Sequence, residues 1–225
     1  MDFTAIDFET ANHGRHSACQ LAAVKVRGGQ IVAQHCWLIR PRPFDFSPMN
    51  IAVHGIRPEA VAGEPEFGQC WSSILPQLDG ECLIAHNAPF DIGVLRACLQ
   101  FHELPIPELQ FSCTRLISRN AWPGRDGYGL KPLATWLGVR FRHHDALEDS
   151  IACAKILLAA AESTGAESIE ALEEKLSLRR GTAGNWGYRG AKAAPPQRRA
   201  ARKPTLTSAR LSLPPRSNEW VKNRV

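Results

Sequence analysis

The 225-residue chain lacks a long apolar run and any sign of a secretory leader. No stretch of about 18 apolar residues occurs, so the sequence predicts no transmembrane helix and no membrane association. The opening Met1-Asp2-Phe3 has no basic region followed by an apolar stretch, and we therefore expect no signal peptide. Internal repeats are absent as well, which excludes solenoid and propeller architectures.

Paired cysteines are also missing. The chain has seven cysteines, an odd number, and no two have the C-x-x-C spacing that is typical of zinc or redox sites. Most of them lie within apolar segments, where a free thiol behaves as a small buried hydrophobic group. This pattern predicts neither a disulfide framework nor a zinc site, and it favours a reducing, cytoplasmic location.

Acidic residues are scarce in the last part of the chain. Residues 1–177 hold 15 Lys/Arg and 21 Asp/Glu, a net charge of −6, whereas residues 178–225 hold 12 Lys/Arg and one acid, a net charge of +11. The second part is also rich in Gly, Pro, Ala and Ser and has no apolar periodicity. We therefore predict a folded domain over residues 1–178 and a basic tail over 179–225 that is disordered from about residue 180.

The basic tail has two interpretations. Its Lys and Arg side chains are suited to non-specific attraction to the phosphate backbone of a nucleic acid. The tail could equally be a solvated extension with no specific role. Its three aromatic residues leave the same ambiguity, because they could stack on bases or dock on the body; they are Trp186, Tyr188 and Trp220.

The most informative residues in the body are two acids at the end of a buried strand. Residues 3–8 are apolar apart from Thr4, which predicts an inner strand covered on both faces. Because strand side chains alternate, Asp7 and Glu9 point to the same side. Two neighbouring buried carboxylates repel each other and lose hydration, so the pair predicts a bound cation.

The remaining pattern predicts an α/β domain with a mixed five-stranded sheet flanked by helices. Residues 19–26 and 30–39 form a predicted hairpin, and further strands are expected at 82–85 and near 109–112. Helices are predicted at 48–53, 57–61, 66–77, 89–101, 130–137, 147–161 and 168–176.

Two further acids stand at the start of predicted helices. The helical face that begins with Asp91 continues with the apolar residues Val94 and Leu95. The face that begins with Asp149 continues in the same way with Cys153 and Ile156. An acid in a first helical turn often serves only to complement the helix dipole. Both acids head the face that must pack against the sheet, however, and this position favours a functional role.

A histidine and two more acids surround Asp149. His144 lies five residues before it, where the side chain can reach over the site. A histidine at such a position can also be a capping or surface residue. Asp145 and Glu148 are interpreted as capping or solvent-facing groups.

These motifs together resemble the DEDDh family of 3′–5′ exonucleases, which includes the proofreading epsilon subunit of bacterial DNA polymerase III and related stand-alone enzymes. The resemblance covers about residues 2–160 and rests on three segments in order: Asp7-x-Glu9, His86-Asn87-Ala88-Pro89-Phe90-Asp91 and His144-x4-Asp149. Asn50-Ile51-Ala52-Val53-His54-Gly55-Ile56 resembles a further family segment. The sister subclass has Tyr four residues before the last Asp, where this chain has Asp145.

The resemblance implies a ribonuclease H-like fold and release of nucleoside monophosphates from a 3′ end. It also implies two Mg²⁺ ions, which Mn²⁺ can replace, held by Asp7, Glu9, Asp91 and Asp149 as metal ligands and catalytic residues. Asp7 would bridge the ions and His144 would be the general base, since its reference pKa of about 6.5 lies near working pH. Four carboxylates would balance the charge of two such ions, and Mg²⁺ prefers oxygen ligands.

Substrate contacts are expected from four further residues. The resemblance suggests that backbone groups of Thr10 and Ala11 hold the terminal nucleotide. His54 could approach the terminal sugar or base, or could pack at a helix end. Asn87 could touch substrate but is better suited to bracing its own loop.

Three functions remain open from the sequence. The first is a metal-dependent exonuclease acting on nucleic acid with a free 3′ end, with single-stranded DNA as the expected substrate. The second is an RNA-trimming exonuclease of the same fold, since no residue decides how a 2′-hydroxyl is treated. The third is a non-catalytic nucleic-acid-binding protein, which the intact set of acids argues against. Association with a polymerase is compatible with the resemblance, although no docking motif is evident.

Overall fold

The computed structural model describes residues 1–194, and residues 195–225 lie outside it. Over the described range no helix is both long and apolar enough to cross a membrane. All seven cysteines fall within this range, and all are free thiols.

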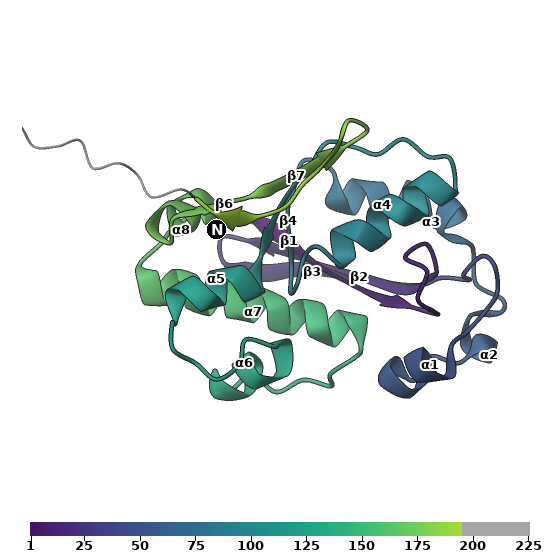
Figure 1. Cartoon of the computed structure of the whole chain (residues 1–225), viewed down its shortest axis with the longest axis horizontal. Helices are drawn as coiled ribbons and strands as arrows, with labels where there is room; N and C mark the ends of the chain where they lie inside the picture. The colour runs from purple at the N-terminus through teal and green to yellow at the C-terminus, as the bar shows by residue number, and fades with distance from the viewer. Residues whose placement is uncertain (195–225) are drawn as a thin grey trace, which may run out of the picture. The chain divides into compact units, whose positions relative to one another are not determined.

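A seven-stranded mixed sheet forms the centre of the molecule, with the strand order β3-β2-β1-β4-β5-β7-β8 (Figure 1). Its first three strands form an antiparallel meander, and β4 and β5 run parallel to β1. The strands are β1 (Phe3–Thr10), β2 (Ala18–Arg27), β3 (Gln30–Leu38), β4 (Cys82–Ala85), β5 (Leu109–Cys113), β7 (Gly181–Gly184) and β8 (Gly187–Arg189).

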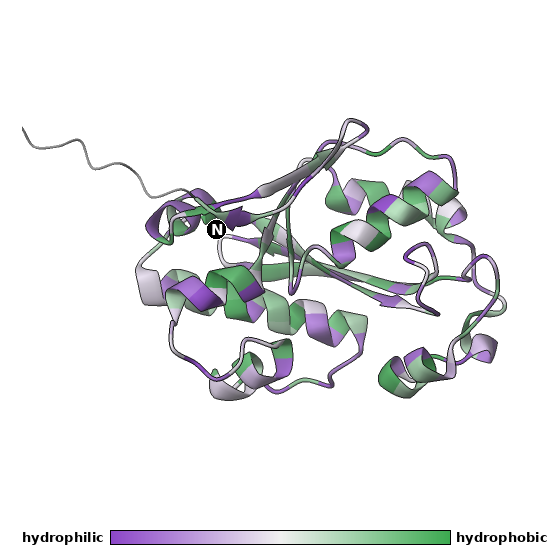
Figure 2. Cartoon of the chain, in the orientation of Figure 1, coloured by the Kyte–Doolittle hydropathy of each residue, from purple (hydrophilic) through white to green (hydrophobic). Residues whose placement is uncertain are grey.

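Helices cover both faces of the sheet and make two hydrophobic cores (Figure 1). Alternation along β1 divides its side chains: Ile6 and Phe8 join the core beneath α3 and α4, whereas Phe3 and Ala5 join the core beneath α6 and α7. Figure 2 shows this apolar interior along the central strands. The helices are α1 (Pro48–His54), α2 (Pro58–Val61), α3 (Phe67–Leu78), α4 (Asp91–Phe101), α5 (Thr114–Ala121), α6 (Leu130–Trp136), α7 (Ala146–Thr164) and α8 (Ile169–Lys175).

The α/β class and the five predicted strands are confirmed, but the sheet has two more strands than expected. The chain after α8 forms β7 and β8, which extend the sheet beyond β5, and β6 (Leu178–Arg179), which pairs with β9 (Lys192–Ala193). The expectation of disorder from about residue 180 is therefore wrong up to residue 193. The rest of the predicted tail, with Trp220, lies outside the described residues.

Packing against the body explains why this glycine-rich segment is ordered. A Cβ on Gly181 would lie 2.2 Å from the Phe111 ring, so only glycine lets β7 approach β5 this closely. The Tyr188 ring stacks on Phe111 with centroids 5.5 Å apart. Trp186 donates a 2.9 Å hydrogen bond from its indole N–H to Glu108. For these two aromatic residues, docking on the body is the interpretation that the structure supports.

Helix α5 was not among the predicted elements. Its sequence, Thr-Arg-Leu-Ile-Ser-Arg-Asn-Ala, has a buried face at helical spacing through Thr114, Ile117 and Ser118, but two of these residues are polar and the segment has only eight residues. It is held by packing of Ile117 into the core beneath α7. The helix brings Thr114 beneath the end of β4, where the hydroxyl lies 2.9 Å from Nδ1 of His86.

Candidate active site

The carboxyl end of β1 places three carboxylates together. Asp7 and Glu9 lie two residues apart on one face of the strand, which is the face covered by α7. Asp149, in the first turn of α7, completes the group: carboxylate oxygens of Asp7, Glu9 and Asp149 all lie within 4.8 Å of one another. This spacing is suited to a shared cation.

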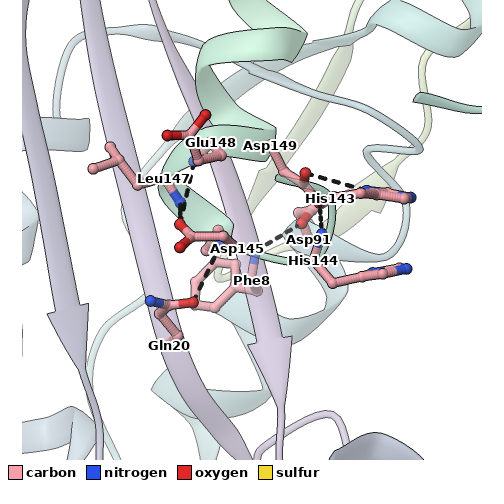
Figure 3. A network of polar contacts seen from close by, with 10 residues as sticks. Phe8, Gln20, Asp91, His143, His144, Asp145, Leu147, Glu148 and Asp149 are labelled. Atoms are coloured by element: carbon pink, nitrogen blue, oxygen red, sulfur yellow. Dashed lines mark hydrogen bonds and ion pairs between the residues drawn. The ribbon is translucent and has the colours of Figure 1, made fainter. Parts of the chain in front are cut away.

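The start of α7 fixes the position of Asp149 (Figure 3). Asp145 is the N-cap and accepts hydrogen bonds from the N–H groups of Leu147, at 3.1 Å, and Glu148, at 3.3 Å. Its capping role, predicted from the sequence, is confirmed. Asp149 follows one turn later and is itself buried. The cap therefore orients the first turn so that this carboxylate faces β1.

Asp91 joins the group from the opposite helix. It is the first residue of α4 and is 1% exposed. Its Oδ1 accepts a 3.2 Å hydrogen bond from the N–H of Phe8, which lies between the two acids of β1 (Figure 3). The four predicted metal ligands, Asp7, Glu9, Asp91 and Asp149, are thus brought together at one end of β1.

Burial and mutual repulsion perturb all four acids. Burial is the largest cause in each case and raises the pKa of Asp7, Glu9, Asp91 and Asp149. For Asp7 the neighbouring carboxylates of Asp91, Asp149 and Glu9 raise the pKa further. The pKa of Glu9 reaches about 7.

This donor set fits hard divalent cations. Carboxylate oxygens are the preferred ligands of Mg²⁺, and a doubly charged ion would offset the repulsion that raises these pKa values. Among residues 1–194, the two groups of side chains spaced to share a metal ion consist of acids and histidines: Asp7, Glu9 and Asp149, and His143, His144 and Asp149. Asp7, Glu9, Asp149 and Asp91 are the residues that could hold such ions.

Two adjacent histidines cover the site, where the sequence reasoning singled out only one. Nδ1 of His143 lies 3.1 Å from Oδ2 of Asp149, whereas His144 donates its backbone N–H to the same oxygen at 3.1 Å. The two rings stack with centroids 3.8 Å apart. His144 has φ of 67°, a left-handed conformation that turns the chain between the rings. The His143-His144 doublet was the only sequence signal for the second histidine.

A cleft of about 360 Å³ adjoins Glu9 and contains two predicted substrate residues, Thr10 and His54. His54 receives the N–H of Ile56 on Nδ1 at 3.0 Å, so its Nε2 carries the proton and donates to the Thr10 carbonyl, 3.2 Å away. Asn50, which the sequence reasoning did not assign, donates to the same carbonyl at 2.8 Å. The loop after β1 is thereby fixed to α1.

The two other predicted substrate residues, Ala11 and Asn87, are less directly connected with the cleft. Ala11 is fully buried, with its N–H bonded to the Ser17 carbonyl and its own carbonyl bonded to the Ser47 N–H, both at 2.8 Å. A substrate contact through its backbone stays a prediction; the N–H is already used, whereas the carbonyl oxygen can accept a second hydrogen bond. Asn87 is exposed, with φ of 73°, and its backbone carbonyl accepts the Phe90 N–H at 2.9 Å.

His86, within the second motif, has a structural role. Its Nε2 donates to the Tyr128 carbonyl at 3.0 Å, which leaves Nδ1 to accept from the Thr114 hydroxyl at 2.9 Å. Burial lowers its pKa to about 4, so the ring is neutral. It ties the loop after β4 to α5 and to the loop before α6.

Comparison with known proteins agrees with this geometry. Residues 4–157 match the family model described as exonuclease, RNase_T. The chain belongs to the exonuclease family. The resemblance to DEDDh exonucleases is thereby confirmed, and the matched residues carry all four acids and both histidines.

Curated relatives of this exonuclease-family chain are longer proteins. It is 31% identical over 144 residues to the PolC-type DNA polymerase III of Streptococcus thermophilus, covering 63% of this chain and 10% of the polymerase. It is 29% identical over 180 residues to the 3′–5′ exonuclease DinG of Bacillus subtilis, covering 78% of this chain and 18% of DinG. The chain thus spans less than a fifth of the length of either protein.

Solved structures of exonucleases share the fold. Exonuclease X in complex with 5′ overhanging duplex DNA is 27% identical, with a TM-score of 0.62, covering 77% of this chain and 98% of that one. The nuclease domain of 3′hExo, a DEDDh family member bound to rAMP, is 20% identical, with a TM-score of 0.63 and coverage of 74% and 94%. The mixed sheet is therefore the ribonuclease H-like arrangement predicted from the motifs.

Proposed function

We propose that this exonuclease-family chain is a metal-dependent 3′–5′ exonuclease that releases nucleoside monophosphates from the 3′ end of DNA. The observation that carries the proposal is the group of Asp7, Glu9 and Asp149, whose carboxylate oxygens lie within 4.8 Å of one another. Buried acids at this spacing destabilise the metal-free fold, so a catalytic cation site explains their presence better than a structural role does.

We propose two Mg²⁺ ions as the cofactors, with Mn²⁺ as a substitute. Asp7 would be the ligand shared by the two ions; its assignment is supported by the carboxylates of Asp91, Asp149 and Glu9, which all lie near enough to raise its pKa. Bound ions of this kind supply charge neutralisation for the attacking and leaving oxygens of a phosphodiester.

The histidine pair is assigned two different tasks. His144 is the proposed general base, because its ring is partly exposed and burial together with His143 lowers its pKa, which keeps it neutral and able to accept a proton. His143 is a positioning residue, since its ring nitrogen holds the Asp149 carboxylate at 3.1 Å.

The cleft beside Glu9 is the proposed site of the 3′-terminal nucleotide. Thr10 and His54 line it, and the exposed side chains of Met49 and Val53 give it an apolar side suited to a base. Asn87 and Ala11 stay secondary candidates for substrate contact. In this assignment His54 holds the loop of Thr10 in place as well as facing the nucleotide.

DNA is the proposed substrate because the relatives include a DNA polymerase and the 27% identical exonuclease X was solved with duplex DNA. A single-stranded or frayed 3′ end suits the open cleft. Association with a polymerase would follow the domain organisation of the PolC-type relative and is likewise a proposal. The seven free cysteines support the predicted cytoplasmic location.

The test is mononucleotide release from 3′-labelled DNA and RNA oligomers of matched sequence, with Mg²⁺ and with EDTA. The proposal predicts release that requires Mg²⁺ and is faster on DNA. Faster release from RNA would assign the RNA-trimming alternative. Absence of metal-dependent release from both would favour the non-catalytic binder.

A further inference from the structure

A groove on the same edge of the sheet has no role in the site described above. It has a volume of about 280 Å³ and is lined by Asn87 and Pro89 from the loop after β4, by Arg115 and Arg119 from α5, and by Ala191 from the segment after β8. We call these five residues the arginine groove. Ala191 belongs to the segment beyond residue 157, where the family match ends.

The arginine groove carries positive charge that the protein does not neutralise. Arg115 and Arg119 are four residues apart on α5, so they project from one helical face, and both are exposed. Within residues 1–194 neither guanidinium forms an ion pair with a carboxylate. Burial is the main cause of the lowered pKa of His86, and the charge of Arg115 lowers it further.

Within the described part of the chain, some arginines are paired with acids. Arg27 pairs with Glu81, Arg142 with Asp145, and Arg180 with both Glu170 and Glu173. The guanidinium of Arg119 instead lies 5.8 Å from the centroid of the Tyr128 ring, a contact that leaves its positive charge in place.

A second, independent observation comes from the segment that closes the groove. Lys192 follows Ala191 directly and lies opposite Arg179 in the β6–β9 pair, and both side chains are exposed. Like charges directly opposite on paired strands are destabilising. An anion that binds this edge would relieve the repulsion, and the phosphates of a nucleic acid carry the matching charge.

The groove lies next to the cleft for the terminal nucleotide, on the other side of one short loop. The loop of residues 87–90 separates them: Phe90 lines the cleft, whereas Asn87 and Pro89 line the groove. Arg15 lines the cleft and donates to the Pro89 carbonyl at 2.9 Å, so it spans the boundary. A nucleic-acid strand that runs from the carboxylates over this loop reaches the groove next.

The distance between the two sites corresponds to a few nucleotides. The registers Ala5–Ile84 and Ile84–Ser112 place the ends of β4 and β5 level with Ile6, next to Asp7. Neighbouring strands lie about 4.8 Å apart, so the end of β5 lies about 10 Å across the sheet from this part of β1. One phosphate per strand occurs about every 3.4 Å along the axis of a stacked helix and at wider spacing along an extended strand, so this span covers at most about three nucleotides.

We propose that the arginine groove binds the phosphate backbone of the substrate strand on the 5′ side of the scissile bond. The assignment rests on the proposed exonuclease function. It names the residues that make the rate of hydrolysis depend on substrate length and on salt concentration. Arg115 and Arg119 contact phosphates within about three nucleotides of the reacting one, and Ala191 closes the far side of the groove. Substrates too short to reach the groove gain nothing from it.

The test compares the double variant Arg115→Gln/Arg119→Gln with the full wild-type chain on two substrates. The first is the nitrophenyl ester of thymidine 5′-monophosphate, which occupies the catalytic site alone. The second is a single-stranded DNA oligomer of about 12 nucleotides, long enough to cross the groove. Lys155→Gln/Arg57→Gln, with the same loss of charge at two exposed positions outside the groove, is the matched control.

The double variant is expected to hydrolyse the ester at the wild-type rate. On the oligomer, the slope of log kcat/KM against log salt concentration is expected to flatten by about 1.4, because each phosphate contact with a single strand contributes about 0.7. When the salt concentration rises from about 50 to about 200 mM, the factor by which kcat/KM falls should therefore be about seven times larger for wild type than for the variant. The control pair should retain the wild-type slope.

Two results would overturn the groove assignment. One is an unchanged slope and kcat/KM on the oligomer. The other is an equal loss on the ester and the oligomer, because the arginines would then act on the catalytic site. If the wild-type chain hydrolyses neither substrate with Mg²⁺, the proposed function fails. Oligomer binding by fluorescence anisotropy, with the same comparison of slopes, then tests the groove by itself.

Discussion

Removing the charge of Glu9 should stabilise the metal-free protein at alkaline pH. Burial and the nearby Asp149 carboxylate raise the pKa of Glu9 from 4.5 to about 7. The folded chain therefore holds this proton more tightly than the unfolded chain does, and stability falls as the pH rises from about 4.5 to 7. Each pKa unit corresponds to about 1.4 kcal/mol, so the full penalty above pH 7 is about 3 kcal/mol.

The assay is urea unfolding of wild type and Glu9→Gln in EDTA, at about pH 5 and about pH 8. The variant should be more stable by less than about 1 kcal/mol at pH 5 and by about 3 kcal/mol at pH 8, because the neutral amide avoids the ionisation penalty. Glu174→Gln, at an exposed position of α8, is the control and should show no such difference between the two pH values.

Magnesium should reverse the order of the two proteins at alkaline pH, since bound ions stabilise the carboxylate that the variant lacks. A Glu9→Gln variant that is less stable than wild type in EDTA, or equally affected at both pH values, would refute the electrostatic reasoning. Glu9 would then be an ordinary packed side chain.

Four further substitutions test other parts of the structure. Asp7→Asn should abolish nucleotide release while its circular dichroism stays native and its stability in EDTA is unchanged or higher; retained release would remove Asp7 from the site. His144→Ala should lower kcat by about 10²–10⁴ at an unchanged Mg²⁺ requirement, whereas His143→Ala should raise the Mg²⁺ needed for half-maximal rate by about ten-fold or more. Identical effects of the two histidine variants would contradict their separate roles. Gly181→Ala should destabilise the fold by about 1–3 kcal/mol in urea, because its Cβ would meet the Phe111 ring; Gly63→Ala, which meets nothing within 4 Å, is the control.

Much of the fold and most of the site could be predicted because the relevant signals are local. Alternation along residues 3–8 identifies the central strand and places Asp7 and Glu9 on one side. Helical periodicity puts Asp91 and Asp149 at the heads of buried stripes, and both are buried in the structure. Neither inference requires knowing which residues, distant in the sequence, pack against these elements.

The features that escaped prediction depend on distant partners. The segment of β7 and β8 looks disordered by composition, but it is ordered by Gly181 and Tyr188 packing on Phe111, about 70 residues earlier in the chain. A truncation at residue 178 would remove these strands, so one that preserves the described sheet must end after residue 194. His143 escaped because it lies in the loop before α7, where no periodicity indicates that its ring meets Asp149.

The central claim is that the acids at the end of β1 form a metal-dependent site that shortens nucleic acid from its 3′ end. The most direct test is a time course on a 5′-labelled DNA oligomer with Mg²⁺, resolved to single nucleotides. The account predicts a ladder of labelled products that shorten one nucleotide at a time and do not form in EDTA. Early release of the labelled terminal nucleotide, internal fragments, or an unchanged ladder in EDTA would contradict it.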